Sequence, residues 1–284
     1  MTQSSPMETP PTGNQALSKA SRLARWGREA LPVVLAFLVF VGLWQLGIVI
    51  FKPKPFIVPG PVDVGQAFLE HGASLWESTL ITLRATAIAF VLSALIGAAV
   101  SFLLTSVPIL YRAVFPFTVV FQSVPVIVFV PLLLTWFGIG LPSIIAVAVI
   151  ISVFPIIANT AIGLRSTEAS LKQLFQLYGA SSWQTLFKLR LPAALPYFFT
   201  GLRIAAGAAV IGVVVGEYMA GMASTRGGLG FLVVESASRL QMAKLAATGV
   251  CAAALGIGFF LLVGYVSNLF LRSWHESARG DQER

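Results

Sequence analysis

The chain has 284 residues and a formal net charge of +8, and 57% of its residues are hydrophobic whereas only 11% are charged. Its mean hydropathy is +0.86. Because soluble domains carry about 25% charged residues, this composition argues strongly against a water-soluble globular protein. The length is better counted in membrane-spanning helices, each of which needs about 20 apolar residues.

The excess of Lys and Arg does not indicate nucleic-acid binding, because these residues lie between long apolar segments and form no single basic patch. In a membrane protein with several spans, such an excess marks the cytoplasmic loops. Cys251 lies in an apolar run and is interpreted as a small buried hydrophobic side chain. The two histidines, His71 and His275, are far apart in sequence, so no metal site and no cofactor is expected.

The first 30 residues are polar, then basic, and are predicted to form a flexible cytoplasmic tail. Residues 31–51 follow without a charge. A signal peptide has an apolar region of only about 7–15 residues and a small-residue cleavage site. We therefore interpret this segment as a retained first span.

Five further apolar segments predict an all-α polytopic membrane protein with six transmembrane helices. A polar tail, 272–284, follows a membrane domain that covers 31–271. With the N-terminus inside, twelve Lys and Arg residues fall in cytoplasmic segments and five in outer loops. This bias predicts that both termini are cytoplasmic. The predicted spans are approximately 31–51, 80–104, 114–137, 141–164, 197–219 and 245–271.

Prolines interrupt two adjacent spans. Proline removes a backbone donor and kinks or breaks a helix, and broken backbone at membrane depth is tolerated where it is buried or lines a watery cavity. The third span contains Pro116, Pro125 and Pro131, and the fourth contains Pro155. Polar groups beside these prolines either bond neighbouring helices together or line a pathway, and their concentration favours the pathway. The candidates are Gln122, Ser123, Pro125, Asn159 and Thr160.

Glu217 is an acidic residue near the outer end of the fifth span. An ionisable group inside a membrane indicates a functional site by default, which adds Glu217 to the pathway candidates. A structural salt bridge with Arg84, near the outer end of the second span, is an equal alternative.

Small residues recur every fourth position in the second and fifth spans. At this spacing they lie on one helix face and allow a neighbouring backbone to approach closely. We interpret both ladders as sites of helix packing. They consist of Ser93, Gly97 and Ser101, and of Ala208, Gly212 and Gly216.

The polar stretch 165–192 predicts two short helices on the cytoplasmic side. The first covers 168–178 and ends at Gly179 in a C′ position. Ser181 or Ser182 caps the second helix, which Leu191-Pro192 ends. Exposed apolar residues next to basic ones indicate a docking element for a soluble partner. The alternative is a pair of helices lying on the lipid surface.

At this loop the sequence resembles the permease subunits of binding-protein-dependent ABC importers, in the nitrate/sulfonate/taurine branch. Their signature is an EAA triplet, three residues, a Gly, nine residues and Ile-x-Leu-Pro. Gly179 and 189–192 match the spacing, whereas the triplet position holds Gln173-Leu174-Phe175, with Gln in place of Glu. Further resemblance lies in 56–61, 136–140, 159–165, 193–196 and 228–230. By this resemblance the ATPase-coupling residues are Gln173, Leu174, Phe175, Gly179, Ala180, Leu189, Leu191 and Pro192.

The resemblance implies a multi-pass permease of the bacterial inner membrane, surrounded by lipid. A second permease subunit, most simply an identical copy, completes the pathway. ABC ATPases bind the 165–192 loop, and an external binding protein delivers the substrate. The sequence has no G-x-x-x-x-G-K-[ST] phosphate loop, so ATP hydrolysis is expected in a partner and the chain is not expected to be an enzyme.

The substrate implied by the resemblance is a nitrate-, sulfonate-, taurine- or bicarbonate-like anion, or a precursor of thiamine or riboflavin. The stretch 213–218 is more similar to the vitamin relatives. A secondary transporter or channel is the first alternative, although it predicts more ionisable residues in the spans and internal repeats. A membrane-embedded enzyme is the second alternative, and of the residues it needs only Glu217 is present.

Overall fold

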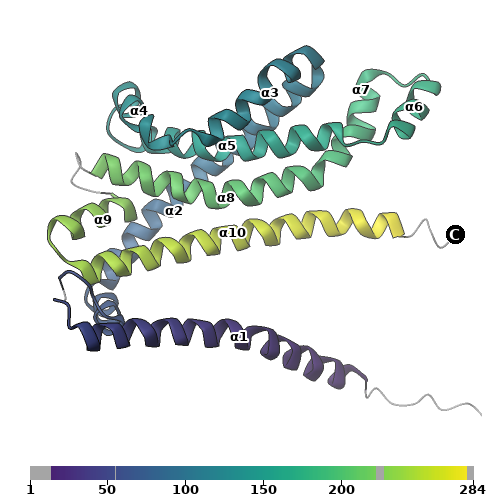
Figure 1. Cartoon of the computed structure of the whole chain (residues 1–284). Helices are drawn as coiled ribbons and strands as arrows, with labels where there is room; N and C mark the ends of the chain where they lie inside the picture. The colour runs from purple at the N-terminus through teal and green to yellow at the C-terminus, as the bar shows by residue number, and fades with distance from the viewer. Residues whose placement is uncertain (1–13, 55, 222–226, 280–284) are drawn as a thin grey trace, which may run out of the picture. The chain divides into compact units, whose positions relative to one another are not determined.

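The computed structural model describes residues 14–54, 56–221 and 227–279, and the chain forms two compact units, Met1–Asp63 and Val64–Arg284 (Figure 1). The described residues form helices, turns and loops and no strand, so the all-α prediction is confirmed for them.

The first unit contains α1 (Asn14–Phe51). Residues 14–30, predicted to be flexible, are helical, because they consist largely of Ala, Leu, Arg and Lys, which are good helix formers. Most of the described large apolar side chains from Leu31 to Phe51 are exposed, as suits a helix surrounded by lipid. At the end of this unit the Gly60 N–H donates to Asp63 Oδ2 over 2.7 Å, which satisfies a free amide beside the start of the next helix.

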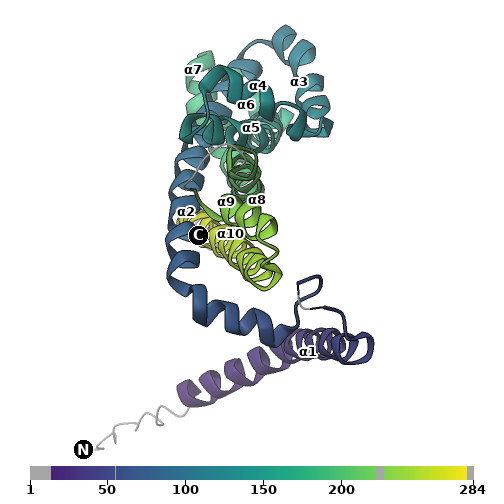
Figure 2. The ribbon, with the colours of Figure 1, turned by 90° about the vertical axis from the view of Figure 1, so that its left-hand side faces the viewer.

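Three long helices form a layer in the second unit, and a fourth crosses it. The layer consists of α5 (Leu141–Arg165), α8 (Leu191–Gly221) and α10 (Met242–Arg279), with α8 in the middle. Figure 2 shows these three nearly end-on, with α2 (Pro61–Ser106) running past all of them. The last residues of α10 are helical although the sequence predicts a tail from 272 onward, since hydropathy marks the span and not the helix end.

The small residues of the two ladders lie where helices touch. Ser93 of α2 is 2.6 Å from Ser152 of α5, hydroxyl to hydroxyl. A Cβ at Gly97 would lie 2.7 Å from a side-chain carbon of Ile156. In α8, Gly212 and Gly216 pack against α5, so the packing interpretation is confirmed for them. Ala208 differs, because it lines a cavity.

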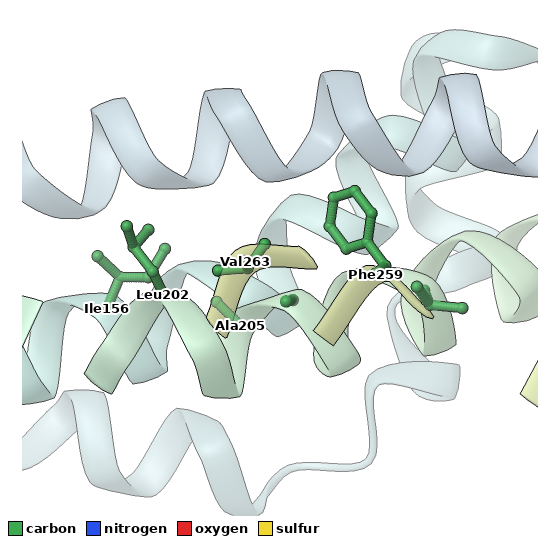
Figure 3. Close-up of a cluster of buried hydrophobic side chains, with 7 residues drawn as sticks. Ile156, Leu202, Ala205, Phe259 and Val263 are labelled. Carbon is green, nitrogen blue, oxygen red and sulfur yellow. The ribbon is translucent and has the colours of Figure 1, made fainter. Parts of the chain in front are cut away.

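One cluster of buried hydrophobic side chains lies where α2 crosses the layer. Figure 3 shows Ile156 of α5, Leu202 and Ala205 of α8, and Phe259 and Val263 of α10 in one cluster beneath α2. The ring of Phe259 meets that of Phe90 on α2 edge-to-face, with 5.3 Å between ring centroids. This arrangement is favourable for aromatic pairs and fixes α2 against α10.

The predicted third span is not one helix. The segment forms α3 (Pro108–Ser123), a 3₁₀ turn η1 (Val126–Val128) and α4 (Val130–Phe137), with Pro125 at the break. The break follows from the missing N–H of proline, whereas Pro131 is tolerated because it lies in the first turn of α4.

Short helices lie at the two opposite ends of the layer (Figure 1). At one end are α6 (Ala169–Leu177), α7 (Ser182–Thr185) and the π-helical turn η2 (Leu186–Arg190). At the other end is α9 (Leu229–Ser238), between α8 and α10.

Among the described residues, five helices are long and apolar enough to cross a membrane, against six predicted spans. The missing one is the broken third segment. The five cover Val34–Phe51, Pro61–Ser106, Leu141–Arg165, Ser182–Gly221 and Met242–Leu271.

Candidate functional site

The loop between α5 and α8 has a fixed shape because both of its turns are capped. At the end of α6, Gly179 adopts φ +66° in the C′ position. The Ala180 N–H donates to Phe175 O over 2.9 Å, and the Gly179 N–H donates to Gln176 O over 3.0 Å. These two bonds define a Schellman motif, which confirms the predicted end of the first loop helix.

The second loop helix begins with a capping box. The Gln184 N–H donates to Ser181 Oγ over 3.2 Å, and the Ser181 N–H donates to Gln184 Oε1 over 2.8 Å. This reciprocal pair satisfies two amides of the helix start and identifies Ser181 as the cap.

The prediction that Leu191-Pro192 ends this helix is wrong. The chain continues through η2 into α8, and the Leu191 N–H bonds Leu186 O, five residues back. A π turn lies directly before Pro192 and changes the hydrogen-bond spacing from four to five residues, so the missing N–H of Pro192 falls where the regular ladder is already interrupted.

The outer surface of this loop is apolar and exposed. Leu177 and Tyr178 are 85% and 83% exposed, and Leu174, Trp183 and Phe187 are also exposed. Of the other predicted coupling residues, Gln173, Gly179 and Leu191 are exposed and Phe175, Ala180, Leu189 and Pro192 are half-buried.

Aromatic and cationic contacts attach the loop to the bundle. Trp183 stacks on Phe187 with 5.8 Å between ring centroids and lies 6.5 Å from Phe102 of α2. Arg165, at the end of α5, lies over the Tyr111 ring of α3 at 4.0 Å, a cation–π distance.

Positive charge is concentrated on the same loop. Partial burial, followed by the neighbouring guanidinium groups of Arg190 and Arg165, lowers the pKa of Lys172 below its usual value. The Lys172 ammonium group also donates to Arg165 O over 3.5 Å. Three cations at close quarters favour an acidic partner surface, because an opposite charge relieves their mutual repulsion.

The pathway candidates of the third span lie at the break. Gln122 and Pro125 are exposed, and Gln122 lines a cavity of about 360 Å³ together with Pro155. The structure therefore brings the polar end of α3 against the proline of α5. The side chain of Ser123 lies outside the described residues.

The candidates of the fourth span lie one turn further along α5. The Asn159 side-chain amide donates to Pro155 O over 2.8 Å, one helix turn back. Thr160 is buried, and its hydroxyl has no hydrogen-bond partner among the described residues. Both residues are separate from the cavity lining.

Glu217 of α8 lies apart from these candidates, and its carboxylate meets the first residues of α9. The Thr82 hydroxyl donates to both Glu217 carboxylate oxygens, over 3.0 and 2.9 Å, and the Gly230 N–H donates to Oε2 over 3.0 Å. The Leu229 N–H in turn donates to Thr82 Oγ1 over 2.8 Å. The carboxylate thus accepts from Thr82 and Gly230, and Thr82 Oγ1 accepts from Leu229, so that together they satisfy two amides at the start of α9, where negative charge is favourable.

The alternative ion pair between Glu217 and Arg84 is not formed. Within the described residues, the ion pairs join Glu235 to Arg239 and to Lys244, whereas the Arg84 side chain is exposed. Thr82 was not among the residues predicted from the sequence, because a threonine in an apolar helix carries no pattern of its own. The available signal in the sequence is the pair of glycines Gly228 and Gly230. In the structure, a Cβ added at either position would collide with Glu217.

The family comparison decides what this membrane protein is. Residues 90–274, which include the broken segment, the capped loop and α9, match the model of the binding-protein-dependent transport system inner membrane component family. The chain belongs to this family. It is therefore a multi-pass inner-membrane permease component of an ABC importer.

Curated relatives align with this chain over nearly their full length. The chain is 34% identical over 249 residues to the formylaminopyrimidine transport permease protein ThiX of Halalkalibacterium halodurans, covering 86% of this chain and 96% of the relative. It is 33% identical to the riboflavin transport system permease protein RibX of Chloroflexus aurantiacus, covering 89% and 92%. It is 25% identical to the nitrate import permease protein NrtB of Leptolyngbya laminosa, covering 85% and 88%.

Membership assigns the division of labour. In ABC importers of this family the permease forms the membrane component, the ATPase activity lies in a partner subunit, and a substrate-binding protein is a further partner. The alternatives of a channel or secondary transporter and of a membrane enzyme are thereby set aside.

Proposed function

We propose that the chain pairs with a second permease subunit, an identical copy, to form the translocation pathway. The loop 165–192 transmits the conformational changes of an ABC ATPase to the membrane helices. The observation that carries this proposal is the capped loop, in which a Schellman motif and a capping box hold an exposed apolar surface in one shape. A rigid loop transmits a displacement, whereas a flexible one absorbs it.

The break between α6 and α7 favours a protein partner over a lipid surface for this loop. The turn at Gly179 separates α6 and α7, so the two do not form one continuous amphipathic helix. The cations Lys172, Arg190 and Arg165 lie close to one another on the same loop and would complement an acidic groove of such a partner.

The six-span topology is part of the proposal. The segment 108–137 is long enough to cross the bilayer as a broken third span when α3, η1 and α4 are taken together. The end of α10 lies at the same end of the layer as α6 and α7 (Figure 1). This placement supports a cytoplasmic C-terminus if the loop is cytoplasmic, and the N-terminus is proposed to lie on the same side.

The coupling proposal predicts a graded series at Gly179. Gly179→Asn keeps the turn, because Asn tolerates the left-handed conformation, and is expected to retain the ATPase. Gly179→Arg adds strain of roughly 1 kcal/mol and a bulky cation and is expected to lose it. Co-purification of the ATPase with detergent-solubilised permease measures this, with Gly65→Arg, at an open position in α2, as control. Retention of the ATPase by a folded Gly179→Arg protein would contradict the proposal.

For the substrate we propose a nitrogen heteroaromatic compound of the vitamin-precursor type. Identity is 34% and 33% to the relatives named for formylaminopyrimidine and riboflavin, against 25–28% to those named for nitrate, aliphatic sulfonates and bicarbonate. The stretch 213–218 within α8 points the same way.

Uptake separates the two substrate classes. Cells that carry the complete transporter are expected to accumulate labelled formylaminopyrimidine or riboflavin, and to lose this uptake when the permease gene is deleted. Uptake of nitrate and taurine is expected to stay unchanged by the deletion. Loss of nitrate or taurine uptake alone would refute the heteroaromatic assignment and leave the importer assignment intact.

A further inference from the structure

A cavity of about 360 Å³ lies where the backbone of the third span is broken. Gln122 and Phe129 line it from the broken segment, Ile151 and Pro155 from α5, and Ala208 and Ile211 from α8. Three elements far apart in sequence therefore meet around one space.

The cavity lies near the middle of two membrane-spanning helices. Ile151 and Pro155 fall in the central part of α5 (Leu141–Arg165), and Ala208 lies near the middle of α8 (Leu191–Gly221). Interrupted helices near the bilayer midplane are a common setting for transport sites. Non-helical backbone at this depth requires a protein or cavity environment, and the cavity next to Pro125 provides one.

The described lining offers no charge to an anion. Among the described residues that line the cavity, Gln122 has the one polar side chain, and none is charged. Nitrate or a sulfonate placed here would lose its hydration without gaining a cationic partner, which is strongly unfavourable. An uncharged ring loses less hydration than an anion, and the aliphatic and aromatic walls favour its burial.

The volume of the cavity and its single side-chain amide restrict the class of ligand further. The volume is at the lower end of the range of about 300–1,000 Å³ for small-molecule sites, so it fits a compact ring system. A glutamine amide offers two donors and one acceptor, which complements the alternating ring nitrogens and amino groups of an aminopyrimidine-like edge.

We propose that this cavity is the intramembrane binding site of the transported substrate, and that it selects an uncharged nitrogen heteroaromatic ring with Gln122 as its hydrogen-bonding residue. The inference rests on the proposed function and adds the site and the physical basis of selection. It also assigns Ala208 to the wall of that site.

Filling the cavity tests the proposal in the complete transporter, reconstituted in vesicles with its ATPase and binding protein. Ala208→Phe is expected to lower uptake of labelled formylaminopyrimidine about tenfold or more, because a bulky ring occupies the site. Ala254→Phe, at an exposed position of α10, is the matched control and is expected to transport like wild type. Wild-type uptake by a folded Ala208→Phe transporter would overturn the proposal.

Gln122 gives a second comparison. Gln122→Leu is expected to lower uptake about tenfold, since the ring would bury its polar edge without a partner, and Gln122→Asn is expected to recover part of it. Equal uptake by the Leu and Asn variants would show that Gln122 does not hydrogen-bond the substrate.

A labelling experiment is independent of transport. In a Cys251→Ala background, Ala208→Cys in the cavity wall is reacted with a maleimide in the presence of formylaminopyrimidine, riboflavin, nitrate or taurine. The two heteroaromatic probes are expected to slow labelling of this residue and leave Ala254→Cys unaffected. Absence of protection by both, or equal protection by the anions, would overturn the site. If protection is seen but ATP-driven uptake of these probes is absent, the proposed transport function fails while the cavity assignment stands.

Discussion

Replacing Gly212 by leucine is expected to force α8 away from α5 and to leave little folded protein. A Cβ at this position would lie 2.5 Å from the Ala148 Cα and 3.1 Å from the Ala148 Cβ. The obstacle is backbone, which no side-chain rotation removes. Overpacking of a well-packed interior costs about 1–3 kcal/mol and sometimes more, and we expect the upper end or beyond for Gly212→Leu.

The same helix offers the control. Gly207 is also in α8, but an added Cβ there meets nothing within 4 Å. Gly207→Leu is therefore expected to unfold within a few degrees of wild type, whereas Gly212→Leu is expected to unfold far earlier or to be absent from the monodisperse fraction. Thermal unfolding in detergent, followed by size-exclusion chromatography, measures both. Similar midpoints for the two variants would show that α5 and α8 do not pack through Gly212.

Local rules account for the parts of the molecule that could be predicted from sequence. Gly179 in a C′ position and a serine cap depend on residues within one or two turns, and both are present as predicted. The interruption at Pro125 follows from a missing N–H group. Small residues every fourth position indicate close helix contact, and Gly97 and Gly212 form such contacts.

Features that depend on distant residues escaped the sequence analysis. The cap of α9 combines Thr82 and Glu217, 135 residues apart, and no spacing rule connects them.

The continuation of the loop helix into α8 was missed because a π turn compensates for Pro192. Hydropathy marks the apolar part of a helix and not its end, so α1 extends on the N-terminal side of its predicted span and α10 continues beyond its own.

Removing the Glu217 carboxylate is expected to release α9 from α2 and α8. In Glu217→Leu the Gly230 N–H and the Thr82 hydroxyl both lose their acceptor in a buried site. Each buried unsatisfied polar group costs about 1–3 kcal/mol, so we expect a total loss of about 2–6 kcal/mol in the free energy of unfolding. Glu217→Gln keeps one acceptor oxygen and is expected to lose less.

Two further variants separate this arrangement from an ion pair. Because Arg84 does not contact Glu217 in the structure, Arg84→Gln is expected to change stability by no more than about 0.5 kcal/mol. Thr82→Val is expected to be non-additive with Glu217→Leu, with a coupling energy of about 1 kcal/mol or more, because the two side chains share one network. Hydrogen exchange of the Leu229 and Gly230 amides gives the most direct readout. Fast exchange in Glu217→Leu with slow exchange in Arg84→Gln is the expected pattern. The reverse pattern would show that Glu217 acts through an ion pair with Arg84 and does not cap the start of α9.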